Sequence, residues 1–243
     1  MASNKTAGLK WALSNLSTHF SSTQQWKLDS CTSSILKMSQ RSIENIHHHL
    51  PIMESPTATG RPPAGLAAIN CILKVTFVEL EDLIDSCFHE EPNMAAVSQS
   101  IWLADVGAPA HIYNNEYYLI DILPEGEGNA TRQFLNDYDD FLEPVRSRLD
   151  TYKVFLDDDY LPPGTGLWPW SLRRLAHAKL YGDANRWDAV SNEIASKARV
   201  TLDESSGENY KHPRIFKSIE ALNVHADRRG AQKVLDLITF LQD

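Results

Sequence analysis

The chain has 243 residues, of which 42% are hydrophobic and 23% are charged. These proportions are ordinary for a globular protein and exclude a chain that is disordered throughout. The formal net charge of -9 argues against general binding to nucleic acid, because an acidic surface repels phosphate backbones.

Helical spacing of apolar residues dominates the first part of the chain. Leu9 and Phe20 belong to a first predicted helix. A second helix is expected from Thr23 until Pro51 ends it, and a third from Ala64 to Glu90. The turn-rich segment 55–63 separates these two helices, so we expect them to form an antiparallel helical hairpin.

The middle of the chain has a different pattern. A short helix is expected to begin after Pro92 and to end near Trp102. The segment 110–122 is rich in β-branched and aromatic residues, which predicts a small two-stranded hairpin. Apolar residues from Phe134 to Leu156 predict another helix, which Pro144 kinks or restarts.

Shorter helices are expected after the linker 157–166. Their apolar residues lie in the segments 172–180, 187–194 and 234–241, with a further helix after Pro213.

The predicted fold is therefore mainly α, a helical bundle of about seven to nine helices with the small hairpin near 110–122. A single helical domain 1–243 is expected, because both linkers are short enough to connect neighbouring helices. A sub-division into a long-helix half, 1–105, and a shorter-helix half, 129–243, is the alternative.

The expected location is cytoplasmic. No apolar run approaches the roughly 18 residues of a membrane span, and the N-terminal residues lack the apolar core of a secretory signal. The cysteines Cys31, Cys71 and Cys87 form no C-x-x-C pair, which suits free thiols in a reducing compartment.

The sequence DYDDFLE, at 137–143, contains D-x-D-D and an overlapping D-D-x-x-E. Carboxylates at such spacings can hold Mg²⁺ on a diphosphate or protonate an alkene. On a helix, Asp137 and Asp140 share a face that Glu143 continues, and this face points away from the apolar side. We expect a solvated helix face, with a diphosphate/Mg²⁺ site as the alternative.

This stretch resembles the aspartate-rich motif of terpene cyclases. The second motif of that family, N-x-x-x-S-x-x-x-E, is matched at Asn192 and Ser196, but Val200 stands where the glutamate should be. The resemblance implies a metal-dependent cyclase or lyase, and the missing glutamate puts that metal site in doubt.

Two clusters could bind a metal. Glu81, Asp85 and His89 lie four residues apart and share one helix face, so they are the candidate ligands for a divalent metal. The run His47-His48-His49 is a weaker candidate, because consecutive residues on a helix diverge by about 100°. No cofactor is predicted.

Two tryptophans and two arginines mark the segment 164–174. Trp168 and Trp170 either seal the start of a helix against the core or line a ligand pocket. In the second case Arg173 and Arg174 could bind a carboxylate or phosphate. The residues that follow, Leu172 to Val190, resemble the helix-turn-helix of lysin-motif modules, which implies glycan binding. That family also needs a strand on each side, and the sequence supports these strands poorly.

Two functions remain open. The first is a soluble helical interaction or regulatory protein that binds a protein partner or a small ligand. The second is a small-molecule enzyme, cyclase-like or metal-assisted, with a site between helices lined by aromatic side chains and carboxylates. A cavity beside the tryptophans with an acid facing it would favour the enzyme, and an exposed apolar groove would favour the binding protein.

Overall fold

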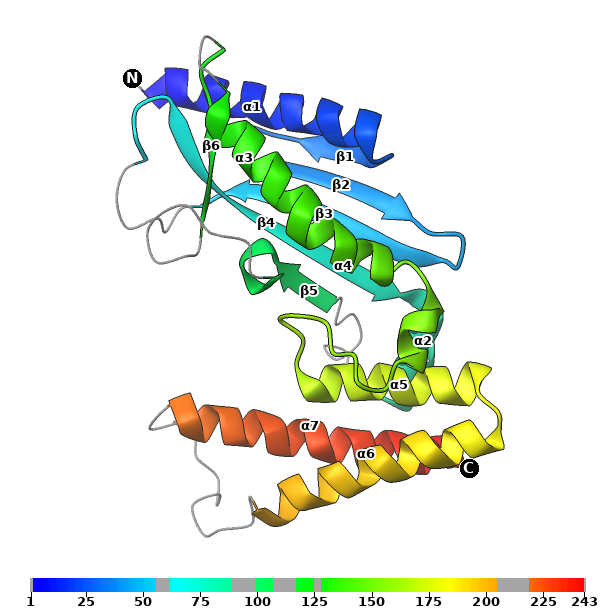
Figure 1. Cartoon of the computed structure of the whole chain (residues 1–243). Helices are drawn as coiled ribbons and strands as arrows, with labels where there is room; N and C mark the ends of the chain where they lie inside the picture. Colours follow the sequence, from blue (N-terminus) through cyan, green and yellow to red (C-terminus); the bar gives the residue numbers. More distant parts are fainter. Residues whose placement is uncertain are drawn as a thin grey trace. The chain divides into compact units, whose positions relative to one another are not determined.

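The computed structural model combines α-helices with a six-stranded antiparallel sheet (Figure 1). It describes the residues 2–55, 62–88, 99–106, 117–124, 128–204 and 219–242. The prediction of a mainly α, all-helical bundle of about seven to nine helices is therefore wrong. The protein is a mixed α/β fold.

The chain divides into two compact units. Unit 1 comprises Met1–Val78, Ser98–Val154 and Pro162–Gly164, and unit 2 comprises Glu79–Val97, Phe155–Leu161 and Thr165–Asp243. Whether the chain folds as one domain, 1–243, or divides near 105–129 stays a prediction.

Unit 1 holds the whole sheet. The strands are β1 (Lys27–Cys31), β2 (Ile35–Arg41), β3 (Ile46–Glu54), β4 (Leu66–Phe77), β5 (Gln99–Trp102) and β6 (Tyr118–Asp121). They follow the order β1-β2-β3-β4-β5, and β6 pairs with the first part of β4. Strands adjacent in sequence therefore pair from β1 to β4, and the long strand β4 also pairs with both β5 and β6.

The helix predicted from Thr23 to Pro51 is instead the strands β1, β2 and most of β3. In β3 the buried residues Ile46, His48, Leu50 and Ile52 recur at every second position, which is the period of a strand. The polar residue His48 interrupts the apolar alternation of this strand, so the sequence did not indicate a strand here. The tight turn into β3 contains Asn45 in the left-handed region, a conformation that asparagine tolerates.

The helix predicted from Ala64 to Glu90 is split between two elements. Its first part is β4, in which alternate residues from Ala67 to Phe77 are fully or almost fully buried. The chain then enters α2 (Val78–Cys87). A continuous apolar run does not distinguish a buried strand from a buried helix, which explains the error. The predicted helical hairpin is consequently a β-hairpin of β3 and β4.

The hairpin predicted near 110–122 is only partly within the described residues. Residues 118–121 form β6, but this strand pairs with β4, through Ile69 opposite Tyr118, rather than with a neighbour in sequence. Residues 107–116 lie outside the described part of the chain. Of the short helix predicted up to Trp102, the described residues 99–102 form β5.

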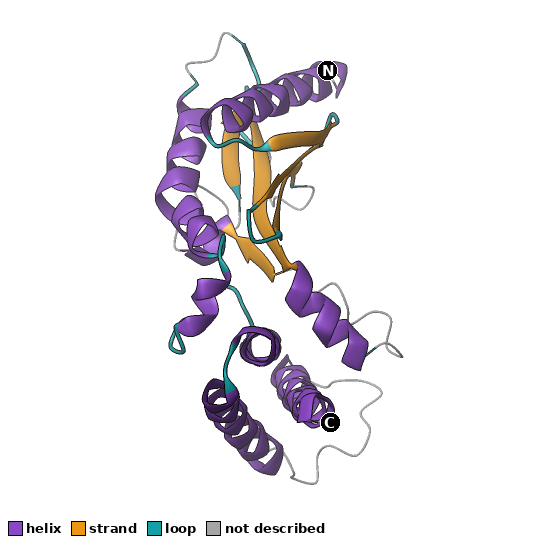
Figure 2. Ribbon diagram, turned by 90° about the vertical axis from the view of Figure 1, so that its right-hand side faces the viewer, coloured by secondary structure: helices purple, strands orange, loops and turns teal. Residues whose placement is uncertain are grey.

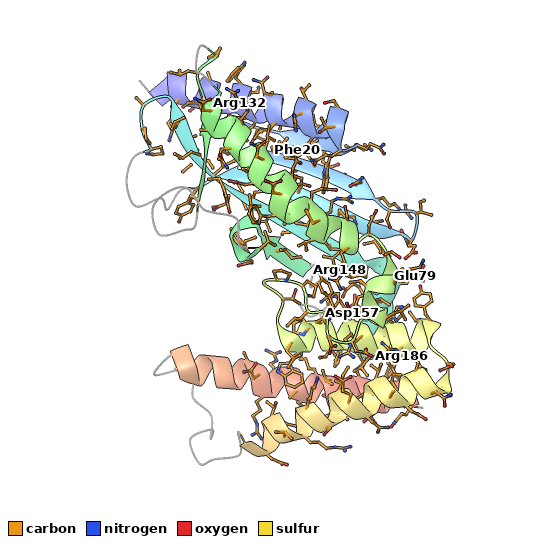
Figure 3. The ribbon with its side chains drawn as sticks, in the orientation of Figure 1. Phe20, Glu79, Arg132, Arg148, Asp157 and Arg186 are labelled. Carbon is orange, nitrogen blue, oxygen red and sulfur yellow. The ribbon has the colours of Figure 1, made fainter. Side chains whose placement is uncertain are left out.

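Helices cover one face of the sheet in unit 1 (Figure 2). The predicted first helix is confirmed as α1 (Ala2–Thr23), and its side chains Leu9, Leu13, Leu16 and Phe20 are buried. Phe20, labelled in Figure 3, packs edge-on against Tyr138 with ring centroids 4.9 Å apart. This contact joins α1 to the second helical segment of the unit.

That second segment runs through α3 (Asn129–Asp137), a π-helical turn η2 (Tyr138–Leu142) and α4 (Glu143–Arg148). The predicted restart at Pro144 is confirmed, because this proline occupies the first turn of α4. A short 3₁₀ turn, η1 (Leu103–Val106), also belongs to unit 1, and a second 3₁₀ turn, η3 (Tyr152–Leu156), spans the point where the chain passes from unit 1 into unit 2.

The described residues of unit 2 form helices and the turns that connect them, with no strand among them. Besides α2 it contains α5 (Leu167–Tyr181), α6 (Ala184–Glu204) and α7 (Ile219–Gln242), which include the helical segments predicted at 172–180, 187–194 and 234–241. Arg186, labelled in Figure 3, binds both carboxylate oxygens of Asp158 at 2.7 Å. None of the described helices is long and apolar enough to cross a membrane.

Candidate functional site

Two of the predicted site groups meet in unit 2. Glu81 on α2 and Trp168 with Arg173 on α5 line one pocket of about 90 Å³. The other lining residues are mainly apolar and come from α2, α5, α7 and the residue after α2: Ile84, Phe88, Pro169, Leu172, Gly230 and Lys233. A predicted metal ligand and two predicted ligand-binding residues thus belong to the same site.

A buried ion pair forms the polar part of this pocket. The Nε of Arg173 donates a hydrogen bond to Oε1 of Glu81 at 2.6 Å, and its Nη1 donates to the carbonyl of Pro169 at 3.1 Å. Burial raises the pKa of the Glu81 carboxyl, and this effect outweighs the lowering by Arg173. The carboxyl group is therefore easier to protonate than an exposed glutamate.

Close approach of α7 to Trp168 shapes the opposite wall. A Cβ atom at Gly230 would lie 2.6 Å from three atoms of Trp168, so only glycine fits at this position without movement. The ammonium group of the buried Lys233 lies 5.4 Å from the ring centroid of Phe88, within the range of a cation–π contact.

The remaining predicted binding residues do not line the pocket. Trp170 stacks on Phe155 with ring centroids 4.6 Å apart, and its Nε1 donates to the carbonyl of Tyr160. This is the arrangement expected of a tryptophan that seals the core. Arg174 bonds to Asp158 at 2.6 Å and to Glu193 at 3.0 Å, so it joins α5 to its neighbours.

The predicted metal group is only partly described. Asp85 on α2 is half-buried, and burial raises its pKa, with Asp82 adding to the effect. His89 lies outside the described residues. Among the residues that are described, no three histidine, cysteine, aspartate or glutamate side chains are placed to share a metal ion.

The carboxylates of 137–143 do not share a face. Asp137 is buried and accepts a hydrogen bond from Gln133 at 2.8 Å, whereas Asp140 is exposed. The π-helical turn adds a residue to the helical repeat at this point, so the positions predicted from 100° per residue are shifted. The prediction that Asp137 points away from the core is wrong.

Glu143 has a structural role in this helix. Both of its carboxylate oxygens accept hydrogen bonds from Nε of Arg146, at 2.9 and 2.8 Å, and the Tyr138 hydroxyl donates to Oε2 at 3.1 Å. Arg146 also lies 3.8 Å from Asp150, whose carboxylate contacts Nε2 of His48 at 3.0 Å. A polar network thus links α4 to the core face of β3.

The two family resemblances gain no support from these positions. Asn192, Ser196 and Val200 lie on α6 in unit 2, whereas 137–143 belongs to unit 1. The segment Leu172 to Val190 folds as parts of α5 and α6. The described residues directly before α5 form no strand, and the residues that follow α6 lie outside the described part of the chain.

Sequence reasoning missed one group because it assigned the wrong secondary structure. On the strand β3, His47 and His49 lie on the same face and His48 on the other. Arg41 is directly opposite His47 in the neighbouring strand. If β3 had been predicted as a strand, the alternation of its side chains would have placed His47 and His49 on one face beside Arg41.

We compared the chain with protein-family models, curated proteins and solved structures, and none of them matches it, so the site's own geometry has to indicate the function.

Proposed function

We propose that this chain is an interaction protein whose unit 2 pocket receives an apolar side chain of a protein partner. The observation that carries the proposal is the pocket itself, with apolar walls formed by Ile84, Phe88, Trp168, Pro169 and Leu172. Leu167, the residue before Trp168, is 44% exposed and extends the apolar surface at the start of α5.

The size of the pocket favours a side chain over a free ligand. A volume of about 90 Å³ is what about three molecules occupy in liquid water, and it roughly accommodates the four carbons of a leucine side chain. Even at the ceiling of about 1.5 kcal/mol per non-hydrogen atom, a free molecule of that size binds no tighter than tens of micromolar. A side chain of a partner protein is not bound by this limit on affinity, because the rest of the partner makes further contacts outside the pocket.

N-acetyl-leucinamide serves as a mimic of such an anchor. In NMR titrations we expect it to shift the resonances of Trp168 and Ile84, with a dissociation constant in the millimolar range (order of magnitude). N-acetyl-alaninamide should shift them much less, because its methyl group leaves most of the pocket empty.

A pair of matched variants locates the binding. Leu172→Trp places a larger side chain in the pocket lining and should abolish the shifts. Leu180→Trp makes the same change on α5 at an exposed leucine outside the lining and should leave them intact. Equal effects of the two variants, or equal shifts from the two amides, would refute the proposal.

One observation favours the small-molecule enzyme instead. The Glu81 carboxyl lines the pocket and has a raised pKa, which are two features of a general acid. Glu81→Gln keeps the shape of the side chain. If this variant folds and binds N-acetyl-leucinamide as tightly as the parent protein, recognition of the anchor does not need the carboxyl group, and a role as a general acid becomes the better explanation of its position.

A further inference from the structure

The face of the sheet in unit 1 that lies opposite the helices α1, α3 and α4 carries basic side chains on three adjacent strands (Figure 2). Lys27 of β1 is opposite Ser39 of β2, which is opposite His49 of β3. Arg41 of β2 is opposite His47 of β3. Side chains directly opposite each other on neighbouring strands share a face, so this register gathers cationic and hydrogen-bonding groups in one place.

These residues line a pocket of about 420 Å³. The full lining is Gln25, Lys27, Ser39, Gln40, Arg41, His47 and His49. The volume lies within the range of about 300–1,000 Å³ that is usual for small-molecule sites. No carboxylate occurs among these lining residues.

The charge of the lining contrasts with the charge of the chain. The protein carries a formal charge of -9, whereas the lining carries the positive charges of Lys27 and Arg41 beside two imidazoles. The two cations also disfavour a metal ion at His47 and His49, because like charges repel. The lining is therefore complementary to an anion.

The hydrogen-bonding groups narrow the class of anion. Arginine presents a planar fork of donors that matches phosphate oxygens, and lysine adds up to three donors. The Nε2 atom of His47 is shielded from solvent and has no hydrogen-bond partner among the described residues. A phosphate group, with three oxygens that accept hydrogen bonds, can use more of these groups than a carboxylate can.

We propose that the pocket lined by Lys27, Arg41, His47 and His49 binds the phosphate group of a small phosphomonoester. A long polyanion fits less well, because the acidic remainder of the chain would repel its other phosphates. The site is independent of the unit 2 pocket and shares no residue with it.

One acid beside the pocket opposes the anion. Asp29 of β1 accepts a hydrogen bond from the Ser39 hydroxyl at 2.7 Å, so it holds that donor away from a ligand. Asp29→Asn should therefore strengthen phosphate binding, because it removes a negative charge next to the ligand. A gain in affinity is a stringent result, because a variant that unfolds would lose affinity for phosphate.

Acidification should also strengthen binding. Partial burial, Arg41 and His49 together lower the pKa of His47, so its imidazole is neutral at neutral pH and gains charge only in acid. A bound anion favours the charged form. The other charged or titratable groups on this face include Lys27, Arg41 and His49, with Lys74 of β4 opposite His49 and Asp29 bonded to Ser39.

The test uses the full chain and calorimetric titration with phenyl phosphate and inorganic phosphate at low salt. Arg41→Gln and Lys27→Gln should each weaken binding by about fivefold to twentyfold, as expected when a charged hydrogen-bond donor is lost. Asp29→Asn should tighten it by about twofold to fivefold. Lys10→Gln, an exposed lysine on α1 outside the pocket, should leave it unchanged.

Sulfate is the probe for pH, because it keeps two negative charges where phosphate would gain a proton. Its affinity should rise between pH 7.5 and 5.5 in the parent protein and rise less in His47→Gln. Vesicles containing anionic lipid and a single-stranded oligonucleotide are the competing ligands. Preferential binding of either one, no binding of phosphate, or equal loss in Lys10→Gln and Arg41→Gln would overturn the proposal.

Discussion

Arg173 Nε lies 2.6 Å from Glu81 Oε1, and both side chains are almost completely buried. Removing two charges from water is expensive, and their mutual attraction offsets that expense only when the pair is intact. The pair joins α2 to α5 and lies at the wall of the unit 2 pocket.

Breaking this pair from one side should be strongly destabilising. Glu81→Leu leaves the Arg173 guanidinium buried without its carboxylate, and we expect the free energy of unfolding to fall by about 3–5 kcal/mol. The double variant Glu81→Leu/Arg173→Met should recover most of this loss, because neither charge remains. Urea unfolding followed by tryptophan fluorescence measures both. A double variant less stable than the single one would contradict this account.

Gly230→Ala should destabilise the packing of α7. The added Cβ atom would lie 2.6 Å from atoms of Trp168, and relieving such a contact costs about 1–3 kcal/mol. Shortening the opposing side chain should relieve it, so the loss caused by Gly230→Ala should be smaller in a Trp168→Leu background. Additive losses in the double variant would show that the two residues are not in contact.

His48 should make the folded protein sensitive to acid. Burial first, then Arg146 and the neighbouring histidines, lower its pKa from 6.5 to about 3, despite the contact with Asp150. Between these two values the unfolded chain binds a proton that the folded protein does not, so stability is present above pH 6.5 and is lost as the pH falls.

The loss from His48 between pH 6.5 and about pH 4.5 should be about 2–3 kcal/mol. Urea unfolding across this range measures it. His48→Gln should show a shallower slope than the parent protein. A slope in His48→Gln parallel to that of the parent protein would show that His48 does not cause the acid sensitivity.

Gln25→Gly should stabilise unit 1. Gln25 has φ 59°, in the left-handed region at the end of α1, where a side chain is disfavoured and glycine is not. We expect the free energy of unfolding to rise by about 0.5–1 kcal/mol, after allowance for the greater freedom of glycine in the unfolded chain. Ser22→Gly, inside the last turn of α1, should lower it by a similar amount.

Helices whose apolar face is continuous could be predicted from sequence. In α1 the spacing of Leu9, Leu13, Leu16 and Phe20 identifies the buried side without reference to any other segment. The helical segments within α5, α6 and α7 were predicted for the same reason. The restart at Pro144 was also predictable, because the ring of proline restricts the backbone locally.

The sheet was missed for an identifiable reason. In β3 the core position 48 is a histidine, and this interrupts the apolar alternation that would have indicated a strand. In β4 both faces are largely buried, so the apolar run has no period that favours a strand over a helix. The pairing of β6 with β4 joins residues about 50 positions apart, which local patterns do not encode.

The composition and the periodicity of the sequence determined a folded, acidic chain and the positions of several of its helices, and they identified Glu81, Trp168 and Arg173 as chemically distinctive residues. Only the tertiary structure placed those three at one pocket and brought Lys27, Arg41, His47 and His49 onto one face of the sheet. The physical reason is that local propensity acts over a few neighbouring residues, whereas strand pairing and helix packing depend on contacts between distant segments. Those contacts decide which side chains meet.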